Sequence, residues 1–106
     1  MNGRRLGDLA KTIRSKNAGV DKITFDIIFR DRETYESVRR SRVLTRETVA
    51  RLYGIPDARI SDFVEFDPAY AIKFTIYRTR PSGSPGDPDI FGAQQYAPLL
   101  DIVVPT

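Results

Sequence analysis

An alternation of apolar and polar side chains over residues 23–29 constrains the fold of this 106-residue chain more than any other stretch. Every second position is apolar, which is the period of a strand with one buried face: Ile23, Phe25, Ile27 and Phe29. Asp26 lies on the opposite face, where water or a helix must accept its carboxylate. The sequence therefore predicts a strand with a strongly apolar face.

Two helices are expected after this strand: the first has a capping residue at its N-terminus, and the second has capping residues at both ends. Asp31 is a suitable N-cap for a helix over residues 32–40. Thr45 is the N-cap of a second helix, and Leu44 and Val49 stand at the two positions of a hydrophobic staple. Gly54, with a proline two residues later, ends that helix.

The remaining segments complete an α+β pattern. Residues 62–67 and 72–77 predict a β-hairpin closed by a proline-containing tight turn, and residues 90–97 and 99–104 predict a short helix and a last strand. Leu6, Leu9, Ala10 and Ile13 recur with the helical period, which favours a helix at the N-terminus, with a strand as the alternative.

This order of elements is that of a ferredoxin-like split βαβ sandwich. We expect a four-stranded, mainly antiparallel sheet with helices on one face, preceded by an N-terminal extension. A chain of 106 residues fits a single domain over residues 1–106. The uncovered face of such a sheet is often used for ligand binding or assembly, so self-association is open.

Composition narrows the chemistry. The chain has no cysteine and no histidine, which excludes disulfides and a Ser-His-Asp triad and makes a zinc or copper site improbable. Catalysis within this chain would need Lys, Asp, Glu, Tyr or Arg, and no cofactor is predicted. No apolar run approaches the ~20 residues of a membrane span, and no apolar segment of a secretory signal follows the N-terminal cations. A cytoplasmic protein is expected.

The net charge is +3 and the isoelectric point is about 9.4. Much of the positive charge falls in the helical region, at Arg39, Arg40, Arg42, Arg46 and Arg51. Such a surface is compatible with nucleic-acid binding. Interspersed glutamates neutralise much of it, and this pattern is more typical of a solvated helix face.

The first candidate site is a polar stretch over residues 14–19, expected to be a loop. Arg14 and Lys16 suit a carboxylate or phosphate, and a desolvated Lys16 beside Arg14 would be a candidate general base. Asn17 and Gly19 tolerate positive φ, so backbone N–H groups there could form an anion-binding nest, and Ser15 adds a hydroxyl. The alternative is an ordinary polar turn at a helix end.

Two further polar stretches lie near the C-terminus. The first, residues 82–87, supplies hydroxyls, glycines and a carboxylate as candidate binding groups, namely Ser84, Gly86 and Asp87. Asp87 and Asp89 alone are too few for a convincing hard-cation site, so no metal is predicted. The second supplies neighbouring amides at Gln94 and Gln95. A surface loop and a solvated helix are the structural alternatives.

Distinctive stretches run through the whole chain, at residues 6–10, 13–19, 24–29, 44–47, 49–55, 66–69, 82–87 and 96–102. Together they resemble the small proteins classed as domain of unknown function 4387. Val20 and Tyr96 depart from the pattern, which has proline and histidine at these places. If that histidine is catalytic in relatives, the tyrosine puts that role in doubt here.

The resemblance implies a partner. It is a larger protein of the acyclic terpene utilisation type, whose small ferredoxin-like C-terminal domain carries a related polar loop where residues 14–19 stand here. The leading hypothesis is therefore a small accessory subunit that adds an anion-holding loop to a shared site for a carboxylic acid or CoA thioester. Two alternatives stay open: a self-contained lyase or isomerase with Lys16 as base, and a nucleic-acid-binding module.

Overall fold

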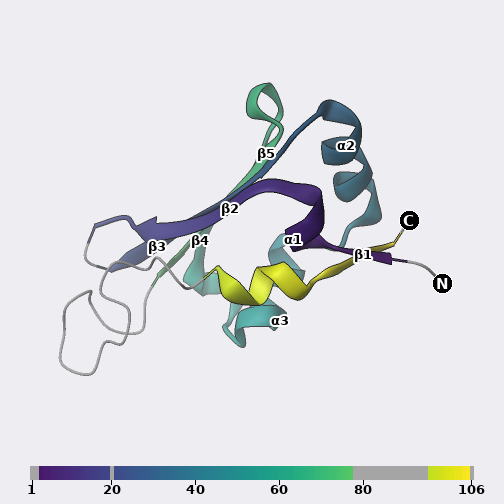
Figure 1. Ribbon diagram of the computed structural model, residues 1–106. Helices are drawn as coiled ribbons and strands as arrows, with labels where there is room; N and C mark the ends of the chain where they lie inside the picture. Colours follow the sequence, from purple (N-terminus) through teal and green to yellow (C-terminus); the bar gives the residue numbers. More distant parts are fainter. Residues whose placement is uncertain (1–2, 20, 78–95, 106) are drawn as a thin grey trace.

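The computed structural model describes residues 3–19, 21–77 and 96–105 (Figure 1). Helices α1, α2 and α3 span Leu6–Leu9, Arg32–Ser41 and Arg46–Tyr53. Six strands are present in the described residues: β1 (Gly3–Arg5), β2 (Ala10–Asn17), β3 (Lys22–Phe29), β4 (Ile60–Phe66), β5 (Ala71–Tyr77) and β6 (Val103–Pro105). Three 3₁₀ helices, η1, η2 and η3, span Asp57–Arg59, Asp67–Ala69 and Ala97–Asp101.

Strands β2, β3, β5 and β4 form one antiparallel sheet in that order. Since β5 is antiparallel to both β3 and β4, these two strands are parallel to each other and are joined through α2 and α3. This arrangement is the split βαβ unit. The expected α+β class is confirmed, and the four-stranded antiparallel sheet is compatible with a ferredoxin-like fold.

The segment that supplies the fourth strand differs from the prediction. Residues 99–104 were expected there, but β2 fills the place beside β3. Residues 97–101 form η3, with Pro98 in its first turn, and β6 pairs with β1 in a separate two-stranded ribbon. Figure 1 shows this ribbon beside α1. The expected helix over residues 90–97 lies mostly outside the described residues.

The N-terminal segment is helical only over Leu6–Leu9 and then extends as β2. Backbone pairing with β3 favours the strand, and a β-bulge between Ala10 and Thr12 accommodates the change of direction. Leu6 and Ala10 are both buried, so the apolar spacing is satisfied without a continuous helix. The helix favoured over residues 6–13 was therefore wrong beyond its first turn.

The ends of α2 and α3 follow their expected capping residues. Asp31 Oδ1 accepts a hydrogen bond from Thr34 N at 2.8 Å, and the Thr45 hydroxyl accepts one from Thr48 N at 3.2 Å. Gly54 ends α3 with φ +63°. The amide of Ile55 then donates to Ala50 O at 2.9 Å, which closes the last turn.

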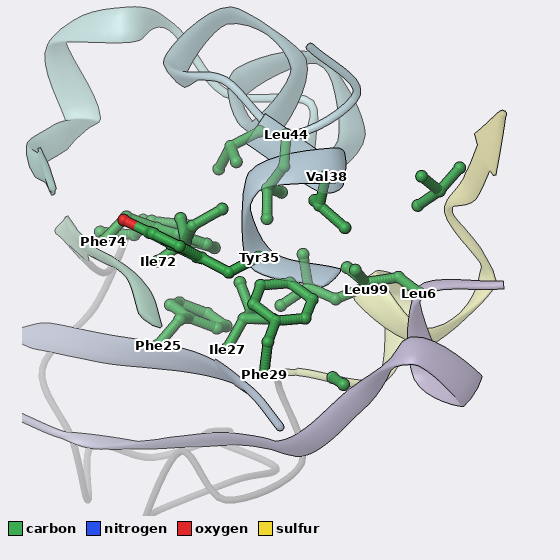
Figure 2. Packing of buried hydrophobic residues seen from close by; sticks show 14 of the residues in the cluster. Leu6, Phe25, Ile27, Phe29, Tyr35, Val38, Leu44, Ile72, Phe74 and Leu99 are labelled. Carbon is green, nitrogen blue, oxygen red and sulfur yellow. The ribbon is translucent and has the colours of Figure 1, made fainter. Parts of the chain in front are cut away.

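Both long helices pack on the same face of the sheet (Figure 2). The ring of Phe25 lies 5.4 Å from that of Tyr53 of α3, and the ring of Phe29 lies 6.2 Å from that of Tyr35 of α2. Phe25 also stacks on Phe74 with ring centroids 4.6 Å apart. The core thus forms between α2, α3 and one sheet face, which leaves the other face for the side chains described next.

No helix of the described residues is long and apolar enough to cross a bilayer.

Candidate functional site on the outer sheet face

Residues 14–17 belong to strand β2, so the expected polar loop is shorter than predicted. In the described part of this segment, the turn begins at Ala18, whose amide donates to Lys22 O at 2.9 Å, and Gly19 has φ +80°. The positive φ that was expected at Gly19 is therefore present. The loop prediction for residues 14–17 was wrong because pairing with β3 continues to Asn17, which lies opposite Ile23.

The pleat of β2 separates the four polar side chains of residues 14–17. Ser15 lies opposite Phe25 and Asn17 opposite Ile23, so both belong to the helix-covered face, and Ser15 is buried. Arg14 and Lys16 belong to the other face and are exposed. Only the two cations can therefore share a ligand on one face of the sheet.

We call the sheet face turned away from α2 and α3 the outer face. Alternation along each strand and pairing between strands decide which residues belong to it. They are residues 12, 14 and 16 of β2, residues 22, 24, 26 and 28 of β3, residues 71, 73, 75 and 77 of β5, and residues 62, 64 and 66 of β4. Its middle row runs across the sheet through Arg14, Asp26, Lys73 and Val64, each directly opposite the next. A buried carboxylate thus stands between two cations.

Asp26 is 4% exposed and is held from both sides. Its Oδ2 accepts a hydrogen bond from Arg14 Nε at 3.1 Å, and its Oδ1 lies 3.5 Å from Lys73 Nζ. Among the described residues, Oδ1 accepts no hydrogen bond. A buried carboxylate needs such cations, because moving its charge out of water costs on the order of several kcal/mol.

The two cations remain accessible while they neutralise Asp26. The side chain of Arg14 is 58% exposed and that of Lys73 is 43% exposed. Arg14 directs its Nε at Asp26, so the fork formed by its terminal nitrogens faces away from this bond and suits a carboxylate or phosphate. Lys16 lies two residues along the same strand and faces the same side.

Hydroxyl and aromatic groups surround this row. The hydroxyls of Thr24 and Thr75 lie 3.2 Å apart, in the row that also contains Lys16. Lys73 Nζ lies 5.8 Å from the centre of the Phe66 ring. A second ammonium, that of Lys22, lies 5.2 Å from the centre of the Tyr77 ring. The outer face therefore combines accessible cations with exposed rings.

The electrostatic balance of the described outer face is positive. Arg14, Lys16, Lys22 and Lys73 outnumber the carboxylates Asp26 and Asp62. This set is suited to holding an anion. It is less suited to proton abstraction by Lys16, because that residue is exposed rather than desolvated. No cluster of three or more potential metal ligands occurs in the part of the chain that the structure describes.

Several predicted binding residues lie outside the described residues: Ser84, Gly86, Asp87, Gln94 and Gln95. Conversely, sequence reasoning missed Asp26 and Lys73 as members of the candidate site. The alternation of residues 72–77 could have placed Lys73 on the polar face of its strand. Its pairing with Asp26 becomes visible only once β3 and β5 are aligned.

Two of the helix arginines, Arg39 and Arg46, pair with carboxylates. Arg39 contacts Glu36 at 2.6 Å and Glu65 at 3.4 Å, and these carboxylates raise the pKa of its guanidinium further. Arg46 contacts Asp57 at 2.8 Å. A hollow of about 250 Å³ is lined by these two arginines together with Arg42, Glu47 and Glu65, so cations and carboxylates are mixed along it.

A second hollow, of about 350 Å³, lies between α2 and the turn that joins β4 to β5. The hydroxyl of Tyr35 donates a hydrogen bond there to Asp67 Oδ1 at 2.6 Å. Burial, reinforced by this hydrogen bond, raises the pKa of Tyr35 well above its usual range. The phenol is thus kept protonated and contributes to structure.

Comparison with known proteins identifies a family. The model of the family described as Domain of unknown function (DUF4387) matches residues 6–103. Curated proteins and solved structures give no match. Since the family model covers β2, β3, α2, α3, β4 and β5, it includes every strand of the main sheet. The chain therefore belongs to the family described as Domain of unknown function (DUF4387).

Proposed function

We propose that this chain is a small cytoplasmic accessory subunit of a larger protein of the acyclic terpene utilisation type. Its outer face holds the anionic group of a carboxylic acid or CoA thioester in a site that the two proteins share. The observation that carries the anion-binding part is the placement of Arg14 and Lys16 on one face of an edge strand. The choice of partner rests on the family resemblance.

The geometry supports binding more than catalysis by this chain alone. Arg14 offers a planar fork and Lys16 a point charge, and Lys73 adds a third cation across β3. Asp26 fixes Arg14 in place through the 3.1 Å hydrogen bond, so the guanidinium is oriented before a ligand arrives. Such preorganisation lowers the entropy lost on binding.

The edge position of β2 supports a shared site. One side of this strand pairs with β3, and none of the described strands pairs with its other side in the main sheet. A larger protein can therefore approach Arg14 and Lys16 from the edge as well as from the outer face. The substrate would then lie between the cations of this chain and catalytic groups of the partner, in a role that fits catabolism of carboxylic acids.

Co-expression with the larger protein tests this proposal. We expect the two proteins to copurify and the pair to show an activity that neither has alone. No association and no joint activity would contradict the subunit role. Activity of the purified chain alone that Lys16→Ala abolishes, without loss of the fold, would favour the lyase or isomerase alternative instead.

A further inference from the structure

The exposed apolar side chains of the described residues are unevenly distributed. Five large ones are exposed, and three of these lie on the outer face: Val64 at 44%, Phe66 at 45% and Tyr77 at 39%. All three belong to β4 and β5, the half of the sheet away from β2. Val64 and Phe66 are neighbours along β4, and Tyr77 lies beyond the row of Asp62 and Thr75. Large apolar side chains exposed on one face of a small protein indicate an interaction surface.

Cations accompany these apolar groups. The ammonium of Lys73 lies over the Phe66 ring at 5.8 Å, and that of Lys22 lies over the Tyr77 ring at 5.2 Å. The surface is thus neither purely apolar nor purely basic. A complementary surface would place apolar side chains against the rings and carboxylates against the two ammonium groups.

From this we infer that the β4–β5 half of the outer face docks on a protein surface of apolar side chains flanked by carboxylates. In this inference, which rests on the proposed function, that surface belongs to the larger subunit. Docking there leaves β2 at the edge of the interface, about 10 Å from β5 at the usual spacing of strands. Arg14 and Lys16 would then face the seam between the two proteins, where a shared ligand can lie.

A second copy of this chain fits the surface less well. Face-to-face pairing would bring the cations of two outer faces together, and the chain already carries a net charge of +3. Among the described residues of this face, only Asp62 is an exposed carboxylate that could compensate. Charge complementarity therefore favours an acidic partner over self-association.

Nucleic acid also fits less well. Single-stranded RNA is bound by aromatic rings that stack on bases across the middle strands of a sheet. Here the central positions of the middle strands present Asp26, Lys73, Thr24 and Thr75 rather than rings, and Tyr77 lies at the end of β5. Phe66 lies on the edge strand β4 instead.

The test measures capture of the larger protein by the full chain and its variants. Val64→Ser and Phe66→Ser, made separately and together, remove the apolar contacts. Leu52→Ser is the matched control, because Leu52 is 39% exposed on α3, away from the outer face. We expect the double variant to weaken binding at least about tenfold, the effect of losing an interface anchor, and the control to bind like the wild type. Added salt and Lys22→Glu should each weaken binding further.

The outcomes separate the two proposals. If the wild-type chain binds and the face variants bind equally well, the docking surface is wrong while the subunit role stands. If the wild-type chain does not bind, both are wrong. A dimer of the free chain that Phe66→Ser dissociates, or binding of a labelled single-stranded RNA that the same variant abolishes, would also overturn the inference. Circular dichroism of each variant, with the single Val64→Ser as the milder change, checks that the fold is kept.

Discussion

Arg14 and Asp26 lie directly opposite each other on β2 and β3, with the Arg14 Nε atom 3.1 Å from Asp26 Oδ2. The carboxylate is buried and the guanidinium is largely exposed. This hydrogen bond helps to neutralise a buried charge and fixes the direction of an exposed cation. The fold therefore depends on a cation that the proposed function uses for binding, and the first prediction tests that dependence.

Removing both cations should destabilise the fold by more than the sum of the single changes. Arg14→Met or Lys73→Met alone leaves Asp26 one cation, and we expect each to cost about 1 kcal/mol, since both side chains are partly exposed. The double variant leaves a buried, unpaired carboxylate and should cost about 3 kcal/mol or more. Urea unfolding at neutral pH measures these free energies.

The triple variant is the control for this cause. Adding Asp26→Asn to the double variant removes the buried charge, so part of the lost stability should return. A triple variant that is no more stable than the double one would show that lost packing, rather than the unpaired carboxylate, is responsible.

Tyr35 should contribute stability through its hydroxyl. The phenol is buried and donates to Asp67 Oδ1 at 2.6 Å. Tyr35→Phe removes this hydrogen bond and should lower the free energy of unfolding by about 1 kcal/mol at pH 7. Thermal or urea unfolding checks it, and an unchanged free energy would mean that the bond adds nothing over hydration of Asp67.

The fold should lose stability as the pH rises above about 10, the ordinary pKa of tyrosine. Burial raises the pKa of both Tyr35 and Tyr53, so an unfolded chain releases these protons while the folded chain retains them. Their contribution is complete below the unfolded pKa and declines above it. The free energy of unfolding of the double variant Tyr35→Phe/Tyr53→Phe should therefore fall less steeply between about pH 9 and 11, the range in which an ordinary tyrosine titrates. Equal slopes in both proteins would contradict this account.

Gly54→Ala should destabilise the protein by about 1 kcal/mol, because Gly54 adopts a left-handed conformation at the end of α3. A Cβ atom there would meet nothing within 4 Å, so the cost is conformational rather than steric. Gly54→Asn should cost less, since asparagine tolerates this conformation. Denaturant unfolding of the three proteins gives the order, and an alanine variant as stable as the wild type would refute it.

The local elements could be predicted because their signals are local. Asp31, Thr45 and Gly54 mark helix ends through side-chain caps and positive φ, all within one turn. Period-two alternation marked β3 and β5 because one face of each strand is covered by helices. These features require no knowledge of the strand order.

The place of β2 depends on distant pairing and could not be read in this way. Leu6 and Ala10 are buried from a short helix and a strand start, so their spacing imitates a longer helix. Leu99 and Val104 are likewise both buried, although Leu99 belongs to η3 and Val104 to β6. The sequence pattern indicates that these residues are buried, but more than one backbone conformation can bury them.

The candidate site was predictable in part for the same reason. Arg14 and Lys16 were found as neighbouring cations. Their separation from Ser15, and their contact with the row through Asp26 and Lys73, follows from strand pleat and pairing. Neighbouring side chains of a loop can all face one ligand, whereas those of a strand point alternately to opposite faces.

The most direct test of the central claim is calorimetric titration of octanoyl-CoA and octanoate into the complex with the larger protein. Arg14→Gln/Lys16→Gln should weaken binding at least about tenfold, because charged hydrogen bonds are lost. Arg40→Gln/Arg51→Gln removes the same charge from exposed helix positions and should bind like the wild type. Equal affinity in all three complexes would contradict an anion-holding role for the outer face.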